Sequence, residues 1–300
     1  MQILKSERYI DEKLDIKPIT KTRLDGFVKP AVDERTKKFI TSNGLEWNSS
    51  TRSYDCKHDI KIYGFNLIDG KLPIRFGIVT GSFEFDSYCY DELVSLEGSP
   101  RYVGKHFDCS DCKKLDTLEG APQMVVGGFD CRYCGLSSLK GAPIEVGGSF
   151  YCSSNNLESL EGAPQKVGGG FECNSNHLKT LNGAPQEVKF FECDHNFLKT
   201  LKGAPQKVHE SFICYRNELT TLEGAPQEVG GCFDCRYNRL TSLKGLPKKV
   251  GKYVDCSNNR IKSIDVEVEE VGGNMLFGSN KNFVKPIQKP SWLKGLLIDR

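Results

Sequence analysis

The chain has 300 residues, and its 41 basic and 39 acidic residues nearly cancel to a net charge of +2. This balance excludes a global electrostatic attraction to nucleic acid or to an anionic membrane, and 38% hydrophobic residues exclude a disordered chain. No run approaches the roughly 18 apolar residues of a membrane span, and the charged first 25 residues contain no signal-peptide core. We therefore expect a cytoplasmic protein without a membrane partner.

Residues 1–52 differ from the rest of the chain because Lys, Glu and Asp dominate them, with Pro18 and Pro30 as breakers. Within this region, residues 33–40 have the pattern of a short amphipathic helix that ends near Asn43 and Gly44. We expect a charged N-terminal arm followed by a helical cap, because the open end of a stacked core needs a cover.

Residues 53–284 repeat the unit F-x-C-x-x-N-x-L-x-x-L-x-G-A-P-Q-x-V-G-G about every 21 residues. The copies before Phe107 are degenerate, and the loop at 86–92 is longer than in the other copies. A fixed period of this length predicts a solenoid, and the apolar residues of 285–300 predict a closing tail. The cysteine of the repeat recurs at intervals of 20 to 22 residues, at Cys109, Cys131, Cys152, Cys173, Cys193, Cys214, Cys235 and Cys256.

One repeat shows how a coil is built. Phe233 and Cys235 alternate with a polar residue, which predicts a short strand with both side chains inward. Asn238 falls where the chain must turn, and the following Gly and Pro prevent a helix on the return path. The sequence thus predicts a mainly β solenoid with one parallel strand per coil and extended or 3-10 structure on its convex side.

This unit resembles the leucine-rich repeat, because F-x-C-x-x-N-x-L corresponds to L-x-L-x-x-N-x-L with Phe and Cys in place of two leucines. The phrase L-x-G-A-P is similar to the corner of the short leucine-rich repeats in bacterial effectors, and L-E-G-A-P-Q-x-V-G-G looks like repeat proteins of large tailed bacteriophages. The resemblance covers about residues 60–284 and implies a leucine-rich-repeat fold and a phage origin, but no activity. Such effectors often carry a catalytic ubiquitin-ligase domain with a nucleophilic Cys, and no Cys follows Ile264 here.

The thirteen cysteines suggest a disulfide or metal framework until they are placed on the repeat. Eight occupy one inward position, where a reduced thiol packs as a small apolar group. Two C-x-x-C pairs have the spacing of a zinc ribbon, although their second members stand where later coils carry Asn. A reduced core ladder is expected, with no cofactor; a disulfide between Cys112 and Cys134 stays open, as does zinc bound by Cys109, Cys112, Cys131 and Cys134.

The outward positions of the strand side are irregular and are the candidate site. Tyr, Arg, His and an exposed Phe are the residue types that dominate protein interfaces. The alternative is a solvated face on which Asp234 pairs with Arg236, and Asp194 with Arg216. The candidate residues are His177, His195, Phe197, Tyr215, Arg216, Asp234, Arg236, Tyr237, Arg239 and Arg260.

The functional hypothesis is a non-catalytic protein-recognition module, phage-encoded, that binds a host or phage protein and inhibits a host defence factor. None of the five histidines stands beside a recognisable nucleophile. Nucleic acid is disfavoured because an acidic column, which includes Asp130 and Asp255, would repel phosphates. The alternatives are a virion-associated, self-assembling protein that uses the loop at 86–92 or the arm, and a zinc-dependent protein. The oligomeric state is left open.

Overall fold

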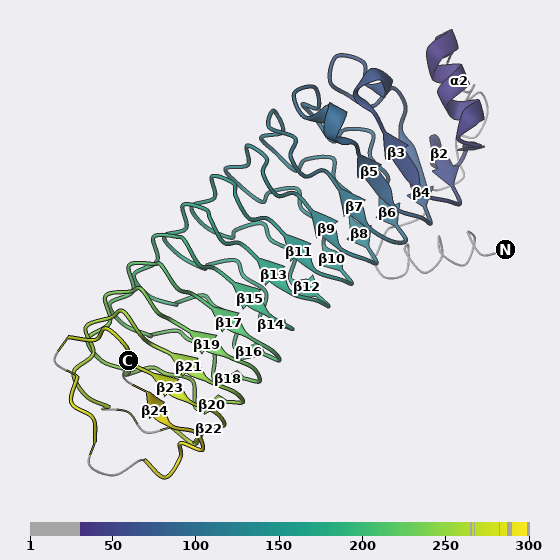
Figure 1. The fold of residues 1–300 in the computed structure, drawn as a ribbon. Helices are drawn as coiled ribbons and strands as arrows, with labels where there is room; N and C mark the ends of the chain where they lie inside the picture. Colours follow the sequence, from purple (N-terminus) through teal and green to yellow (C-terminus); the bar gives the residue numbers. More distant parts are fainter. Residues whose placement is uncertain (1–30, 265, 267, 282, 287–289, 299–300) are drawn as a thin grey trace.

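The computed structural model describes residues 31–298 apart from 265, 267, 282 and 287–289, and these residues form an elongated stack of coils (Figure 1). Each coil adds one strand to a twelve-stranded sheet, whose strands follow in chain order and pair in parallel. The predicted mainly β leucine-rich-repeat solenoid is therefore confirmed. The strands are β3 (Ile60–Ile62), β5 (Phe83–Phe85), β7 (Phe107–Asp108), β9 (Phe129–Asp130), β11 (Phe150–Tyr151), β13 (Phe171–Glu172), β15 (Phe191–Glu192), β17 (Phe212–Ile213), β19 (Phe233–Asp234), β21 (Val254–Asp255), β23 (Met275–Leu276) and β24 (Leu297–Ile298).

Each coil also contributes a second short strand, in the part of the repeat for which the sequence analysis predicted extended or 3-10 structure. These strands form two further sheets of seven and five strands, separated between β12 and β14. The separation coincides with a coil that is one residue shorter, since three residues join Val167 to Phe171 but only two join Val188 to Phe191. The strands are β1 (Glu46–Asn48), β2 (Ser53–Cys56), β4 (Phe76–Val79), β6 (Tyr102–Val103), β8 (Met124–Val125), β10 (Glu145–Val146) and β12 (Lys166–Val167), followed by β14 (Glu187–Val188), β16 (Lys207–Val208), β18 (Glu228–Val229), β20 (Lys249–Val250) and β22 (Glu270–Val271).

The core is a set of ladders that run through successive coils. Phe rings from Phe83 to Phe233 stack with centroids 5.1–5.7 Å apart and are fully buried. Burial of each contributes about 1.5–3 kcal/mol. The ladder cysteines lie beside them, also buried, and their thiols donate to the next coil, as from Cys214 Sγ to the Asp234 carbonyl at 3.3 Å. The thirteen cysteines are free, so no disulfide links Cys112 to Cys134.

A ladder of buried asparagines holds the turns after the strands. The Asn238 amide donates to the carbonyls of Cys214 and Cys235 at 3.1 and 3.0 Å, and its Oδ1 accepts from Leu219 N at 3.0 Å. One side chain thus satisfies three backbone groups in two coils, which a buried turn would otherwise leave unpaired.

The two ends of the described stack are covered differently. Helix α2 (Glu34–Ser42) is the predicted N-terminal helix; Asp33 caps it by accepting from Thr36 N at 2.6 Å, and Phe39 packs edge-on against Phe76. At the other end β24 pairs with β23, and Leu293 and Leu297 join the core. The arm predicted at residues 1–30 lies outside the described residues, and the boundaries 1–52, 53–284 and 285–300 remain predictions.

The second-strand side carries alternating charges on successive coils. Glu145 pairs with Lys166 at 3.9 Å, Glu187 with Lys207 at 3.2 Å, and Glu228 with Lys249 at 3.6 Å. The lysine side chains are more than half exposed, so each pair contributes only about 0–1 kcal/mol. Their arrangement opposes a slip of one coil past the next. None of the helices in the described part of the chain is both long and apolar enough to cross a bilayer.

Candidate functional site

The ten candidate residues lie on or beside the outward side of the twelve-stranded sheet, which we call the strand face. Asp234 points outward from β19, while the other nine stand one, two or four residues after a ladder cysteine, in the turn that follows each strand. Because successive coils repeat in register, these positions form columns along the stack. The structure therefore brings the ten residues into one stripe, from the coil of β13 to the coil of β21.

The residue two places after each ladder cysteine has a left-handed backbone conformation. His195, Arg216 and Tyr237 have φ values of 51°, 50° and 54°. The left-handed conformation costs an L-residue about 1–2 kcal/mol, and Asn, Asp and His adopt it more readily than other bulky side chains. Most other coils have small residues at the same position, at Asp111, Ser154, Ser175, Asn258 and Ser279, and the coil of β9 has Tyr133 with a φ of 55°. The stripe thus has large side chains at three successive positions where most other coils have small ones.

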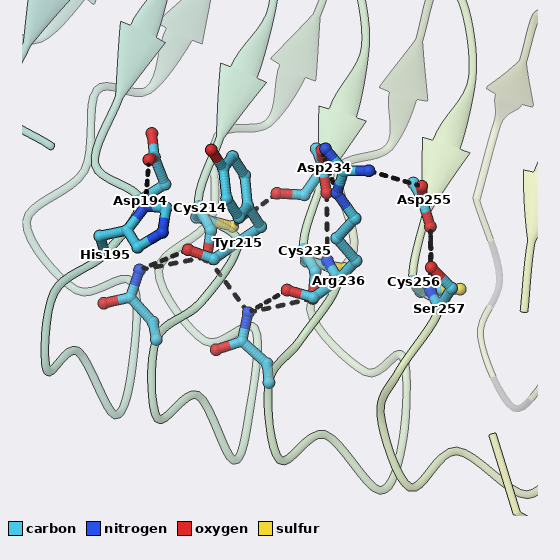
Figure 2. Close-up of polar contacts among 12 residues, drawn as sticks. Asp194, His195, Cys214, Tyr215, Asp234, Cys235, Arg236, Asp255, Cys256 and Ser257 are labelled. Atoms are coloured by element: carbon cyan, nitrogen blue, oxygen red, sulfur yellow. Dashed lines mark hydrogen bonds and ion pairs between the residues drawn. The ribbon is translucent and has the colours of Figure 1, made fainter. Parts of the chain in front are cut away.

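Arg236 and Tyr215 form the centre of the stripe (Figure 2). Arg236 Nε lies 3.0 Å from Asp234 Oδ2, and its NH1 lies 4.0 Å from Asp255 Oδ2. The guanidinium carbon lies 5.0 Å from the centroid of the Tyr215 ring, within the range of a cation–π contact. Asp234 and Arg236 pair as the sequence analysis expected for a solvated face, but the pair also orients the arginine over an aromatic ring.

Asp194 holds His195 in place. Its buried carboxylate lies 2.8 Å from His195 Nδ1, and the Tyr215 ring meets the imidazole edge-on at 5.1 Å (Figure 2). The solvated-face alternative predicted that Asp194 pairs with Arg216, but Asp194 contacts His195, and the Arg216 guanidinium covers the Tyr237 ring of the following coil at 5.3 Å. The sequence analysis missed Asp194 as a residue that orients the stripe.

The outer column of the stripe is more exposed. His177 stacks on Phe197 at 5.9 Å, and Phe197 remains 50% exposed. Arg239 pairs with Glu218 at 2.8 Å, and Arg260 is exposed on the next coil. Phe197 lies between His177 and Glu218 in this column, and the column's aromatic and arginine side chains are of types enriched at interface hot spots.

Burial and neighbouring charges shift the acid–base properties of the face. Burial, with the charges of Asp255 and Asp194, raises the pKa of Asp234 to about 6 against the opposing effect of Arg236. Burial, followed by the charges of Glu172 and Asp194, raises the pKa of Glu192 to about 7. Burial and the charge of Asp194 also raise the pKa of the Tyr215 phenol. Carboxylates stacked on adjacent parallel strands repel one another, which raises the pKa of these carboxyl groups beyond the effect of burial.

A second aromatic–arginine unit lies outside the predicted stripe. Arg132 makes a bidentate contact with Asp130, with NH2 to Oδ2 at 2.6 Å, and covers the Tyr151 ring at 5.1 Å. It repeats the Asp–Arg–Tyr combination of Asp234, Arg236 and Tyr215. The sequence contains a pattern that could have predicted this unit: an Asp and an Arg flank the ladder cysteine, and a Tyr stands on an adjacent coil.

The ladder cysteines are buried and reduced, which bears on the thiol and zinc alternatives. Burial raises the pKa of the Cys193, Cys214 and Cys235 thiols well above the usual value, which disfavours the reactive thiolate beside the Asp194–His195 pair. The zinc alternative lacks support, since no group of three or more His, Cys, Asp or Glu side chains among the described residues is placed to hold a metal. Instead, Cys134 Sγ donates to the Cys109 carbonyl at 3.2 Å and Cys131 Sγ to the Tyr151 carbonyl at 3.3 Å.

The fold and the strand face define a leucine-rich-repeat solenoid with an aromatic and charged stripe on its principal sheet. No family model matches the chain, and the search of curated proteins gave no match. Among solved structures, the chain is similar to YopM from Yersinia enterocolitica WA-314, at 14% identity over 99% of this chain and 73% of that one, with a TM-score of 0.44. It is also similar to YopM, a leucine-rich effector protein from Yersinia pestis, at 17% identity over 80% of this chain and 77% of that one, with a TM-score of 0.40.

Proposed function

We propose that this protein is a non-catalytic recognition module that binds a partner protein through the stripe from His177 to Arg260. The observation that carries the proposal is the set of His195, Arg216 and Tyr237 at left-handed turn positions. Unfavourable backbone conformations persist where function uses them, and small residues occupy this position in most other coils, with Tyr133 as the large residue outside the stripe. A solvated face gives no reason for large side chains at three successive turns of this kind.

The contacts around the stripe favour binding over solvation. Asp194 and Asp234 fix His195 and Arg236 from beneath, so these side chains lose little freedom when a partner covers them. Tyr, Arg and Phe contribute most of the binding energy in typical interfaces. Five coils at about 4.8 Å each give a stripe roughly 24 Å long, which suits the approximately 800 Å² that each partner contributes to a specific complex.

The origin and target belong to the same proposal. The likeness of the repeated phrase to tailed-phage repeat proteins supports a phage-encoded protein that acts in the host cytoplasm. Its partner would be a host or phage protein, and inhibition of a host defence factor is the role that we propose. The acidic residues between the Phe and Cys ladders, such as Glu172 and Glu192, argue against a nucleic acid partner because they repel phosphates.

The test replaces the strained residues by the serine that other coils already use there. A tagged bait that carries His195→Ser, Arg216→Ser and Tyr237→Ser is compared with the unmodified chain in lysates of infected and uninfected bacteria. We expect a protein that the unmodified bait retains and the triple variant loses, while the variant keeps the circular dichroism spectrum of the unmodified chain. Tyr133→Ser, the same change outside the stripe, is the matched control. Recovery of identical proteins by the unmodified and triple-variant baits would contradict the proposal.

A further inference from the structure

Four exposed apolar side chains gather where the first coils are enlarged, at the 3-10 helices η1 (Gly64–Asn66) and η2 (Ser87–Cys89). Phe65 is 68% exposed and Tyr88 78%, with Ile68 and Val94 at 43% and 38%. The two helices touch, since a Cβ on Gly64 would lie 2.6 Å from the Tyr88 carbonyl oxygen. We call residues 63–70 and 86–94 the aromatic knob. Clustered apolar exposure of this kind marks an interaction surface.

The aromatic knob has a fixed base. Asp86 caps η2 by accepting from Tyr88 N at 3.1 Å and forms an ion pair with Lys61 at 2.8 Å. Cys89 is fully buried and donates to the Ile62 carbonyl at 3.3 Å. Phe65 stacks on Tyr63 at 5.3 Å. The exposed rings are therefore presented by an ordered support, which reduces the entropy that binding would cost.

A cleft of about 620 Å³ lies at the same end of the stack, between the β1–β2 hairpin and the first coils. This N-terminal cleft is of the size that takes small ligands or inserted side chains. Trp47, Leu72, Pro73 and Ile74 give it apolar walls, and neither Phe65 nor Tyr88 lines it. Its charged lining residues among those described are Arg52, Lys71, Arg75, Arg101 and Glu97, and Lys71 pairs with Glu97 at 3.5 Å, so the lining has a net positive charge.

The charges of the aromatic knob have the opposite sign. Besides the paired Asp86, it exposes Asp69, Asp91 and Glu92 around its apolar side chains. We propose that the aromatic knob of one chain docks into the N-terminal cleft of a second copy, and that a two-fold axis makes this contact twice. The two surfaces are complementary, with apolar residues inside a rim of opposite charge, and one chain carries both.

The expected interface is modest in size. Each buried Phe or Tyr covers about 150–250 Å². The dimer would bury Phe65 and Tyr88 of both chains, and these four rings with the cleft walls that they contact reach the lower range of specific interfaces. We expect a dissociation constant on the order of 1–100 µM, which weakens with salt because charges contribute. The knob on β5 and the first coil of the stripe, on β13, are four coils or roughly 19 Å apart. A dimer would therefore leave two strand faces free and could bind bivalently.

The experiment is sedimentation velocity of the full chain over a range of concentrations, with charge-reversed variants. One variant carries Asp91→Lys and Glu92→Lys in the knob, and the other carries Arg52→Glu and Arg75→Glu in the cleft. Each variant alone should dimerise at least about tenfold more weakly, since both of its contacts oppose like charges. Their equimolar mixture should dimerise again, because every contact in the mixed dimer joins opposite charges.

Two single substitutions distinguish docking of the aromatic knob from a general effect of charge on self-association. Phe65→Ser should weaken dimerisation while the circular dichroism spectrum is retained, and Arg216→Ser on the strand face should leave it unchanged. A monomer at all concentrations, or variants that dimerise like the unmodified chain, would overturn the proposal, as would a mixture that stays monomeric. Dimerisation only after removal of residues 1–30 would also overturn it, because the chain's own N-terminal segment would then be the occupant of the cleft.

Discussion

The buried asparagine of each coil shows how one side chain can serve two neighbouring turns. In the coil of β19, Asn238 contacts the carbonyls of Cys214 and Cys235 and the amide of Leu219. Because these backbone groups are buried, water cannot replace the side chain if it is lost. The regular spacing of Asn within this chain's own repeats follows from this requirement of hydrogen bonding, whatever the protein binds.

Asn238→Ala should reduce the free energy of unfolding by about 2–4 kcal/mol, since three buried backbone groups lose their partner. The measurement is urea denaturation followed by circular dichroism. Asn156→Ala is the matched control, because Asn156 is exposed and its change should cost less than about 0.5 kcal/mol. Equal effects of the two substitutions would show that the ladder does not hold the turns.

Glu192 should make stability depend on pH. The fold raises its pKa from the usual 4.5 to about 7, so the folded chain binds this proton more tightly than the unfolded chain. The free energy of unfolding should therefore rise as pH falls from 8 to about 4.5. Glu192→Gln should flatten part of this rise and stabilise the protein at pH 8 by about 0.2–1 kcal/mol, the range of a like-charge cross-strand pair.

The matched control for this pH effect is Glu158→Gln, measured by the same denaturation series. Lys179 lowers the pKa of Glu158, so the stability that this carboxylate contributes is present above its usual pKa and is lost only at lower pH. Glu158→Gln should therefore leave the change in the free energy of unfolding between pH 8 and pH 5 as it is in the unmodified chain. A Glu192→Gln profile parallel to that of the unmodified chain would contradict the assignment.

At the scale of elements, the helix and the principal strands could be predicted, but the second sheets could not. The polar alternation of Phe233 and Cys235 indicates a strand directly, and Asp33 indicates a helix start. Strands β16 and β19 both have two residues, but β19 is followed by the inward Cys235, whereas β16 has Val208 as its one buried residue and so shows no alternation. The second strands pair because the principal ladder already sets the register of adjacent coils. The sequence therefore indicated where the second strands lie in each coil but not that they pair into sheets.

Gly170 and Phe190 pack against each other between β12 and β14, where the second sheets separate. A Cβ on Gly170 would lie 2.1 Å from the Phe190 ring, so Gly170→Ala forces the ring to move and should cost about 1–3 kcal/mol. In a Phe190→Ala background the same change should be neutral or slightly stabilising, because the obstacle is gone. A double-mutant cycle by urea denaturation measures this coupling, and additive effects would contradict it.

At the scale of the whole molecule, repetition made the fold predictable and left the details of the site open. The ten stripe residues were found from their outward positions, since register alone puts them in columns. Asp194 was assigned to Arg216 because both are charged and lie on adjacent coils, but the left-handed turn at Arg216 directs its side chain onward to Tyr237. Such rotamer choices depend on three-dimensional packing that no linear pattern contains.

A solenoid also predicts where the molecule opens first. Each coil contacts only its neighbours, so a coil near an end is held less firmly than one in the middle. Thiol labelling in mild denaturant, read by mass spectrometry of peptides, can follow this because the ladder cysteines Cys173 and Cys256 are both fully buried. We expect Cys256, near the C-terminal end, to be labelled several times faster than Cys173. Equal rates at the two sites would show a single cooperative unit, and stability would then not be a sum over neighbouring coils.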